Sequence, residues 1–239
     1  MFLAKITLGG GKMGFEYIRE NLDSLLAEIK TLEKKCGREV TLVAVTKSGS
    51  DEELIALAGA GAMDIGENRP QELRRRGDLL GQHGYSPRLH EIGNLQRNKV
   101  KMIIEDVSLI HSLDNLPLAE EIDRQAKRVG RVVPVLVEIN SAREEQKGGI
   151  LPEDAEEFIL SLQELSGIRV AGLMTMGPVL DDPEGMRPYF RETKALFDRL
   201  NRRFGFDNGI LSMGMSDSYR VAIEEGATLI RVGRKLFNR

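Results

Sequence analysis

Residues 40–47 read VTLVAVTK, an apolar run rich in β-branched side chains that ends on a lysine. Such a run is typical of a strand that is buried on both faces of a parallel sheet. The residues that follow, SGSDEE, predict a loop and then a helix whose capping box is formed by Ser50 and Glu53. The stretch therefore predicts one strand–loop–helix unit, with Lys47 at the carboxyl end of its strand.

The same unit recurs along the rest of the chain. Further strands are expected at residues 62–66, 88–92, 107–111, 132–139, 169–174, 209–212 and 228–232. Helices are expected from residue 50, from residue 70, at 96–105, 114–129, 152–165, 184–204 and 216–225, and after residue 233. About eight such repeats predict a single TIM (β/α)8 barrel, and a doubly wound open sheet is the alternative.

The beginning of the chain stands outside this repeat. Apolar residues recur at three- and four-residue steps over residues 16–35, which predicts an extra N-terminal helix. The preceding residues include the triplet Gly9-Gly10-Gly11 and predict a flexible N-terminus over residues 1–14. Residues 15–239 are then expected to form the barrel domain.

The composition argues against several classes of partner. The chain has 239 residues, a net charge of -3 and no tryptophan, so neither a basic field nor an aromatic platform for nucleic acid is expected. No apolar run approaches the roughly 18–20 residues of a membrane span, and no signal peptide is evident. Cys36 is the only cysteine, which fits a reducing, cytoplasmic location.

Lys47 is the first candidate for chemistry, because TIM barrels place their functional residues at the carboxyl ends of the strands. Burial there would favour the neutral amine, which can form a Schiff base with an aldehyde. The alternative is an ordinary strand-end lysine whose ammonium group reaches solvent.

A second candidate site lies on the loops expected after strands 7 and 8, where TIM barrels often hold a phosphate. These loops read MGMSD at residues 213–217 and RVGR at 231–234. Gly214 and Gly233 would let the backbone approach an anion, and the hydroxyl of Ser216 together with helix N-termini would supply hydrogen-bond donors. The alternative is that both glycines only serve tight turns.

An imine-forming lysine and a phosphate site on one barrel face together suggest pyridoxal 5′-phosphate (PLP). Arg231, at the end of strand 8, could then face the pyridine nitrogen and keep it unprotonated. A different phosphorylated ligand, bound without an imine, is the alternative. The three histidines, His83, His90 and His111, do not show metal-ligand spacing, so no metal site is expected.

These residues resemble the pyridoxal phosphate homeostasis proteins, whose fold is similar to the N-terminal barrel of alanine racemase. The strings IGNLQRNK at 92–99 and LSMGMSD at 211–217 are specific in combination, and the resemblance covers roughly residues 16–239. The other matching pieces are AVTK at 44–47, IGEN at 65–68, Gln71-Glu72, His90, Asn140-Ser141, Lys147 with Gly149, GLMTM at 172–176 and RVG at 231–233.

The resemblance implies a PLP-binding barrel that holds the cofactor on Lys47 as an internal aldimine. It implies that phosphate is held by the loops after strands 7 and 8, that Arg231 meets the pyridine nitrogen and that Asn68 lines the pocket near the ring. The cofactor-binding residues expected in this chain are Lys47, Asn68, Met213, Gly214, Ser216, Arg231, Gly233 and Arg234. The family has no established catalytic activity, and its suggested role is to hold and deliver PLP, with PLP-dependent apoenzymes as potential recipients.

Three residues depart from the family pattern. Arg234 stands where the family usually has threonine, Glu91 replaces an aromatic residue after His90, and Arg69 replaces a tyrosine after the GEN triplet. A guanidinium at position 234 can bind phosphate in a bidentate manner, or it can point to solvent. Arg74, Arg75 and Arg76 are expected on an exposed helix face.

A PLP-dependent amino-acid racemase is the alternative function. Racemisation needs a base on each face of the substrate. In alanine racemase the second base is a tyrosine from another domain, and this chain ends soon after strand 8. We therefore expect a cofactor-binding protein, monomeric and without catalytic residues. Lys147, in a glycine-containing loop, could reach over the pocket mouth.

Overall fold

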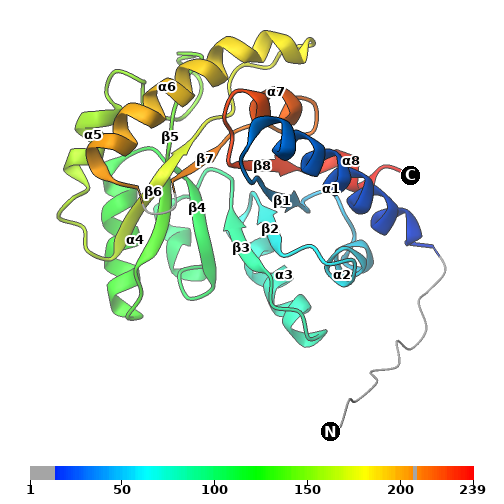
Figure 1. Cartoon of the computed structure of the whole chain (residues 1–239). Helices are drawn as coiled ribbons and strands as arrows, with labels where there is room; N and C mark the ends of the chain where they lie inside the picture. Colours follow the sequence, from blue (N-terminus) through cyan, green and yellow to red (C-terminus); the bar gives the residue numbers. More distant parts are fainter. Residues whose placement is uncertain (1–13, 207–208) are drawn as a thin grey trace, which may run out of the picture.

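Eight parallel strands close into a barrel in which each strand pairs with the next and β8 pairs with β1 (Figure 1). The computed structural model describes residues 14–206 and 209–239. The predicted TIM barrel is confirmed, and the open-sheet alternative is wrong. The strands are β1 Thr41–Val45, β2 Asp64–Glu67, β3 Arg88–Glu91, β4 Val107–Leu113, β5 Val133–Glu138, β6 Ile168–Met174, β7 Ile210–Ser212 and β8 Leu229–Val232.

Helices cover the outside of the barrel (Figure 1). They are α1 Glu16–Cys36, α2 Asp51–Gly59, α3 Pro70–Gln82, α4 Leu116–Arg128, α5 Ala155–Ser161, α6 Arg187–Phe204, α7 Tyr219–Glu224 and α8 Arg234–Phe237, with 3₁₀ helices η1 Arg97–Met102 and η2 Pro183–Met186. The predicted capping box is confirmed at the start of α2, where Ser50 Oγ accepts from the N–H of Glu53 and the Glu53 carboxylate accepts from the N–H of Ser50.

Four predicted helices differ from those observed, and one of them, expected at 184–204, divides into the short η2 and α6, which begins at Arg187. The segment expected as a helix at 96–105 is the short η1, because only four residues separate Met102 from the start of β4. Helix α5 begins at Ala155 rather than residue 152. Helix α7 begins at Tyr219 rather than residue 216, because residues 215–218 form a turn closed by the N–H of Ser218 donating to Met215 O over 3.0 Å.

The strands bury apolar side chains on both faces, as the VTLVAV run predicts. A small cluster fills the barrel interior and consists of Val43, Leu109, Leu136, Ala171, Met174 and Leu229. A larger cluster lies between the barrel and its helices and includes alternate residues of the same strands, such as Ala44, Ile110 and Val137. Two-sided burial explains why these strands read as continuous apolar runs.

The predicted extra N-terminal helix is confirmed as α1. Its apolar face buries Ile18, Leu22, Leu25 and Ile29 against the outside of the barrel, where it runs beside α7 and α8 (Figure 1). The helix ends at Gly37, which adopts a left-handed conformation (φ 68°) that a glycine tolerates well. Residues 1–13 of the segment predicted to be flexible lie outside the described residues.

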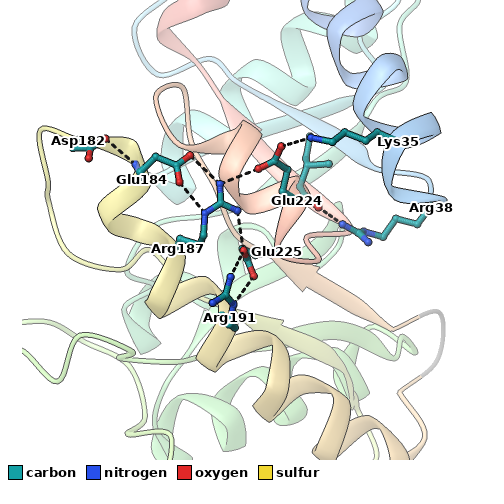
Figure 2. A network of polar contacts seen from close by, with 9 residues as sticks. Lys35, Arg38, Asp182, Glu184, Arg187, Arg191, Glu224 and Glu225 are labelled. Carbon is teal, nitrogen blue, oxygen red and sulfur yellow. Dashed lines mark hydrogen bonds and ion pairs between the residues drawn. The ribbon is translucent and has the colours of Figure 1, made fainter.

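Ion pairs fasten α1, η2, α6 and α7 to one another on the surface. Figure 2 shows Arg187 between three carboxylates, with Glu184, Glu224 and Glu225 each accepting from its guanidinium over 2.8 to 2.9 Å. Lys35 of α1 donates to Glu224 over 2.8 Å. We call this set, together with Arg191, the Arg187 cluster. Among the helices in the described part of the chain, none is long and apolar enough to cross a membrane.

Candidate functional site

Lys47 lies at the carboxyl rim of the barrel, two residues beyond the end of β1 and in a turn. It lines a cavity of about 370 Å³ together with Ser48, Glu67, Asn68, Arg69, Glu72 and Arg76. The side chain of Lys47 is exposed, so the prediction that it would be buried is wrong. The reason is that β1 ends at Val45, which carries the lysine past the closed barrel and into the loop.

Arg76 of α3 stabilises the loop that carries Lys47. Its guanidinium donates to Thr46 O over 2.6 Å and to Gly49 O over 2.9 Å, and it lies 3.3 Å from the Glu67 carboxylate. Arg76 is buried, so the prediction that it lies on an exposed helix face is wrong, although it holds for Arg75. Its four-residue spacing from Leu80, on the buried face of α3, is the signal that could have revealed it.

The loops after β7 and β8 contact each other and the end of β1. The N–H of Gly233 donates to the buried Ser216 Oγ over 3.3 Å. A Cβ on Gly233 would lie 2.9 Å from Val45 O, so only a glycine lets β8 pass this close to the strand that leads into Lys47. The three predicted segments therefore converge on one side of the rim.

The backbone conformation at position 214 requires a glycine. It has φ 93°, and a Cβ there would lie 2.5 Å from the Ala222 side chain. Within the described residues, the N–H groups of Ser216 and Asp217 donate no hydrogen bond, and both follow directly on this turn. Adjacent free N–H groups beside a buried hydroxyl are the donor set that a phosphate prefers.

Arg231 is buried inside the barrel rather than at its surface. Its Nη1 donates to Ser212 Oγ over 2.5 Å and its Nη2 to Thr175 O over 3.1 Å. Burial lowers the pKa of Arg231 to about 10, opposed by the nearby Glu138 carboxylate. The guanidinium has five N–H groups, so these two bonds leave donors for a ligand.

The remaining predicted cofactor-binding residues differ in their placement. Asn68 shares the cavity of Lys47. Met213 belongs to the cluster between the barrel and the helices, so only its backbone faces the loop. Arg234 is 70% exposed and pairs with Asp217, which turns its guanidinium towards solvent in this structure.

Glu138 is a residue at the rim that the sequence analysis did not single out. It ends β5 two positions after the inward-facing Leu136, and burial raises its pKa to about 7, helped by Asp114 and opposed by Arg231. The period of two along β5 could have placed it on the inner face. Close by, Lys147 donates to Glu144 over 2.8 Å and to Gly177 O over 3.2 Å, which ties its loop to the one after β6.

Comparisons with known proteins show the family of this chain. The family of the alanine racemase N-terminal domain matches residues 21–238. A pyridoxal phosphate homeostasis protein of Aquifex aeolicus is 40% identical over 221 residues, which cover 91% of this chain and 96% of that protein. The chain belongs to this family.

Solved structures extend the comparison. PipY of Synechococcus elongatus, solved with PLP bound, is 30% identical and superposes with a TM-score of 0.81, covering 92% of this chain and all of that one (100%). An alanine racemase of Clostridium difficile in complex with cycloserine is 20% identical with a TM-score of 0.73. It covers 94% of this chain but only 60% of the racemase, and at this identity it shows a shared fold. The family resemblance drawn from the sequence motifs is therefore confirmed.

Proposed function

We propose that this chain binds PLP at the rim of its barrel and acts as a PLP homeostasis protein that holds the cofactor and delivers it. The observation that carries the proposal is the position of Gly233. Its N–H donates to Ser216 Oγ, and a Cβ on it would lie 2.9 Å from Val45 O, so the loops after β7 and β8 lie beside the end of β1, two residues before Lys47. The PLP bound to PipY, a relative over nearly the whole chain, supports the same assignment.

The residues present fit the cofactor. When bound, PLP would supply an aldehyde, and the Lys47 amine would hold it covalently through a C=N bond, with release of water. The free N–H groups of Ser216 and Asp217, with the Ser216 hydroxyl, would hold the phosphate. An unused N–H of Arg231 would donate to the pyridine nitrogen and keep it unprotonated.

The positions of two of the four tyrosines favour a binding protein over the racemase alternative. Racemisation needs a second base opposite Lys47. The Tyr219 hydroxyl, on the helix after β7, donates to Glu28 of α1 over 2.7 Å, on the outside of the barrel. The Tyr17 hydroxyl is bonded to Glu53 of α2. Both are therefore engaged in the helical layer.

The finer features belong to the same proposal. We expect the protein to be a cytoplasmic monomer that carries PLP as a Schiff base and passes it to PLP-dependent apoenzymes, without binding nucleic acid or membranes. The net charge of -3 is consistent with the last point.

Borohydride reduction and intact mass measurement test the proposal. The protein incubated with PLP and reduced should gain the mass of one pyridoxyl phosphate group, and peptide mapping should place it on Lys47. Lys47→Arg, which keeps the charge, should abolish the gain. Lys147→Arg, the matched control on the loop after β5, should retain it. If Lys47→Arg still gained this mass, Lys47 would be excluded as the attachment point. If the protein bound a phosphorylated ligand saturably but gained no mass, a ligand held without an imine would be favoured.

A further inference from the structure

A line of buried polar side chains crosses the barrel interior from the end of β8 to the start of β2. Arg231 Nη1 donates to Ser212 Oγ, which lies 3.0 Å from His111 Nδ1. His111 Nε2 lies 3.0 Å from His90 Nδ1, and His90 Nε2 lies 2.9 Å from Asp64 Oδ1. We call these five residues the interior column.

The column connects the two faces of the barrel. Arg231 lies towards the carboxyl rim, next to the last residue of β8, whereas Asp64 is the first residue of β2, at the opposite face. There the Asp64 carboxylate accepts two hydrogen bonds from Arg88, over 2.6 and 2.5 Å, and the Arg88 side chain is 60% exposed. The step from His111 on β4 to Ser212 on β7 spans strands that are not neighbours, so it passes through the barrel interior.

The chemistry of the two ends fixes the order of the protons between them. A guanidinium can only donate, and an ionised carboxylate can only accept. Burial alone would raise the pKa of Asp64, but hydrogen bonds from Arg88 and His90 outweigh it and lower the pKa to about 2. Burial also lowers the pKa of His111 well below its ordinary value, so His111 is neutral.

With a donor at the Arg231 end and an acceptor at the Asp64 end, each group between them accepts one hydrogen bond and donates one. Ser212 accepts from Arg231 and donates to His111 Nδ1. The Nε2–H of His111 then donates to His90 Nδ1, and the Nε2–H of His90 donates to Asp64. The reverse order would require a doubly protonated His90 and would leave the Ser212 hydroxyl without an acceptor among the described residues.

The hydrogen bonds of the interior column connect Arg231 to the carboxylate of Asp64. No carboxylate hydrogen-bonds to the Arg231 guanidinium within residues 14–206 and 209–239. Glu138 faces it through space, and the pKa of that carboxyl, raised to about 7 by burial, leaves it partly protonated near neutral pH. Asp64, by contrast, keeps its charge throughout this range.

We propose that the interior column is a positioning device that holds Arg231 and transmits to it the charge of Asp64, so that a residue on the far face of the barrel tunes the group facing the cofactor ring. Its connection to the ring rests on the proposed function, through the role of Arg231. The proton order itself concerns only the protein and stands apart from cofactor binding.

Nitrogen-15 NMR of the histidine rings in the PLP-free protein tests the proton order. His90 and His111 should both be neutral Nε2–H tautomers at pH 7, with Nδ1 unprotonated. A proton on His111 Nδ1, or two protons on His90, would overturn the proposal. Since no cofactor is present, this outcome is independent of whether the chain binds PLP.

Asp64→Asn tests the transmission of charge, because its amide oxygen still accepts from His90 while the charge is lost. It should shift the absorption maximum of bound PLP and weaken PLP binding by about 5–10-fold. Asp78→Asn, on the exposed face of α3, makes the same change in net charge and should alter neither. Wild-type spectrum and affinity in Asp64→Asn would overturn the transmission, whereas a wild-type protein that fails to bind PLP would instead refute the proposed function. If Asp64→Asn does not fold, the tautomers of the wild-type protein still decide the proton order on which the transmission depends.

Discussion

The protein builds two polar networks in opposite ways. The interior column joins one cation to one carboxylate through Ser212, His111 and His90, and all of its members are buried. The Arg187 cluster joins charged groups to each other directly (Figure 2), and its members are partly exposed to solvent. The first network depends on every donor having an acceptor, whereas the second depends on net charge balance.

The difference has a physical cause. A buried polar group that loses its partner cannot be compensated by water, at a cost of about 1–3 kcal/mol. A surface ion pair is screened by salt and by the high dielectric constant of water, and its members can be rehydrated when a partner is removed. The column should therefore be intolerant of single substitutions, and the cluster tolerant of them.

The largest effect is expected for His111→Phe. The substitution keeps a planar ring but leaves His90 Nδ1 without its partner and the Ser212 hydroxyl proton without an acceptor, although Ser212 Oγ still accepts from Arg231. The free energy of unfolding, measured by urea titration, should fall by about 2–4 kcal/mol. Arg191→Met, at an exposed member of the Arg187 cluster, is the control and should change it far less. Equal losses in the two variants would remove the distinction between the networks.

A smaller effect, dependent on pH, is expected for Glu91→Gln. Glu91 is buried, its Oε1 accepts from the N–H of Gly93 over 3.0 Å, and its Oε2 has no hydrogen-bond partner in the described part of the chain. Burial raises the pKa of Glu91 to about 8, helped by Glu67 and opposed by the Gly93 N–H. The folded state therefore keeps a proton that the unfolded state releases.

It follows that this carboxyl makes the native protein less stable as pH rises from the ordinary glutamate range towards 8. Glu91→Gln keeps the bond from Gly93 and abolishes the titration. Its stability relative to the wild type should increase between pH 5 and pH 8, by on the order of 2–3 kcal/mol. Urea midpoints measured across this range provide the check, and a difference that stays constant with pH would contradict the buried, protonated state of Glu91.

The smallest effect is expected for Arg187→Met, although Arg187 contacts three carboxylates. Glu224 keeps its bond from Lys35, and Glu225 keeps its bonds from Arg191. Glu184 loses its partner, but its side chain is 60% exposed, so water can solvate the carboxylate. The thermal midpoint should fall slightly at low salt, and the difference from wild type should shrink at 1 M NaCl. A loss as large as that of His111→Phe and insensitive to salt would show that the cluster behaves like the interior.

Much of the fold followed from sequence because its signals are local. The apolar run at 40–45, the Ser50–Glu53 capping box and the periodic apolar face of α1 each depend on neighbouring residues, and each is present. The boundaries that were predicted poorly, at η1, α5 and α7, depend on how much chain remains to reach the next strand. The closed barrel sets the length of chain available for each helix, and the helix propensity of the residues does not.

The candidate site divides in the same way. Position at the strand ends identified Lys47, Gly214, Ser216, Arg231 and Gly233, since barrel topology brings the carboxyl ends of strands to one rim. Sequence reasoning failed for Arg76, which was assigned to an exposed face, because its contacts form only once helix α3 has packed against the loop after β1. It failed for the burial of Lys47 because the closed barrel ends β1 at Val45, two residues earlier.

By itself, the sequence determined the repeating β–α order, the family and the identity of the residues at the rim, because periodicity and motifs are written along the chain. Only the tertiary structure decided that His90 and His111 join Asp64 to Arg231, since these side chains come from strands far apart in sequence and meet only inside a closed barrel. Burial then compels each polar group to find a partner, and the proton order of the column is the result.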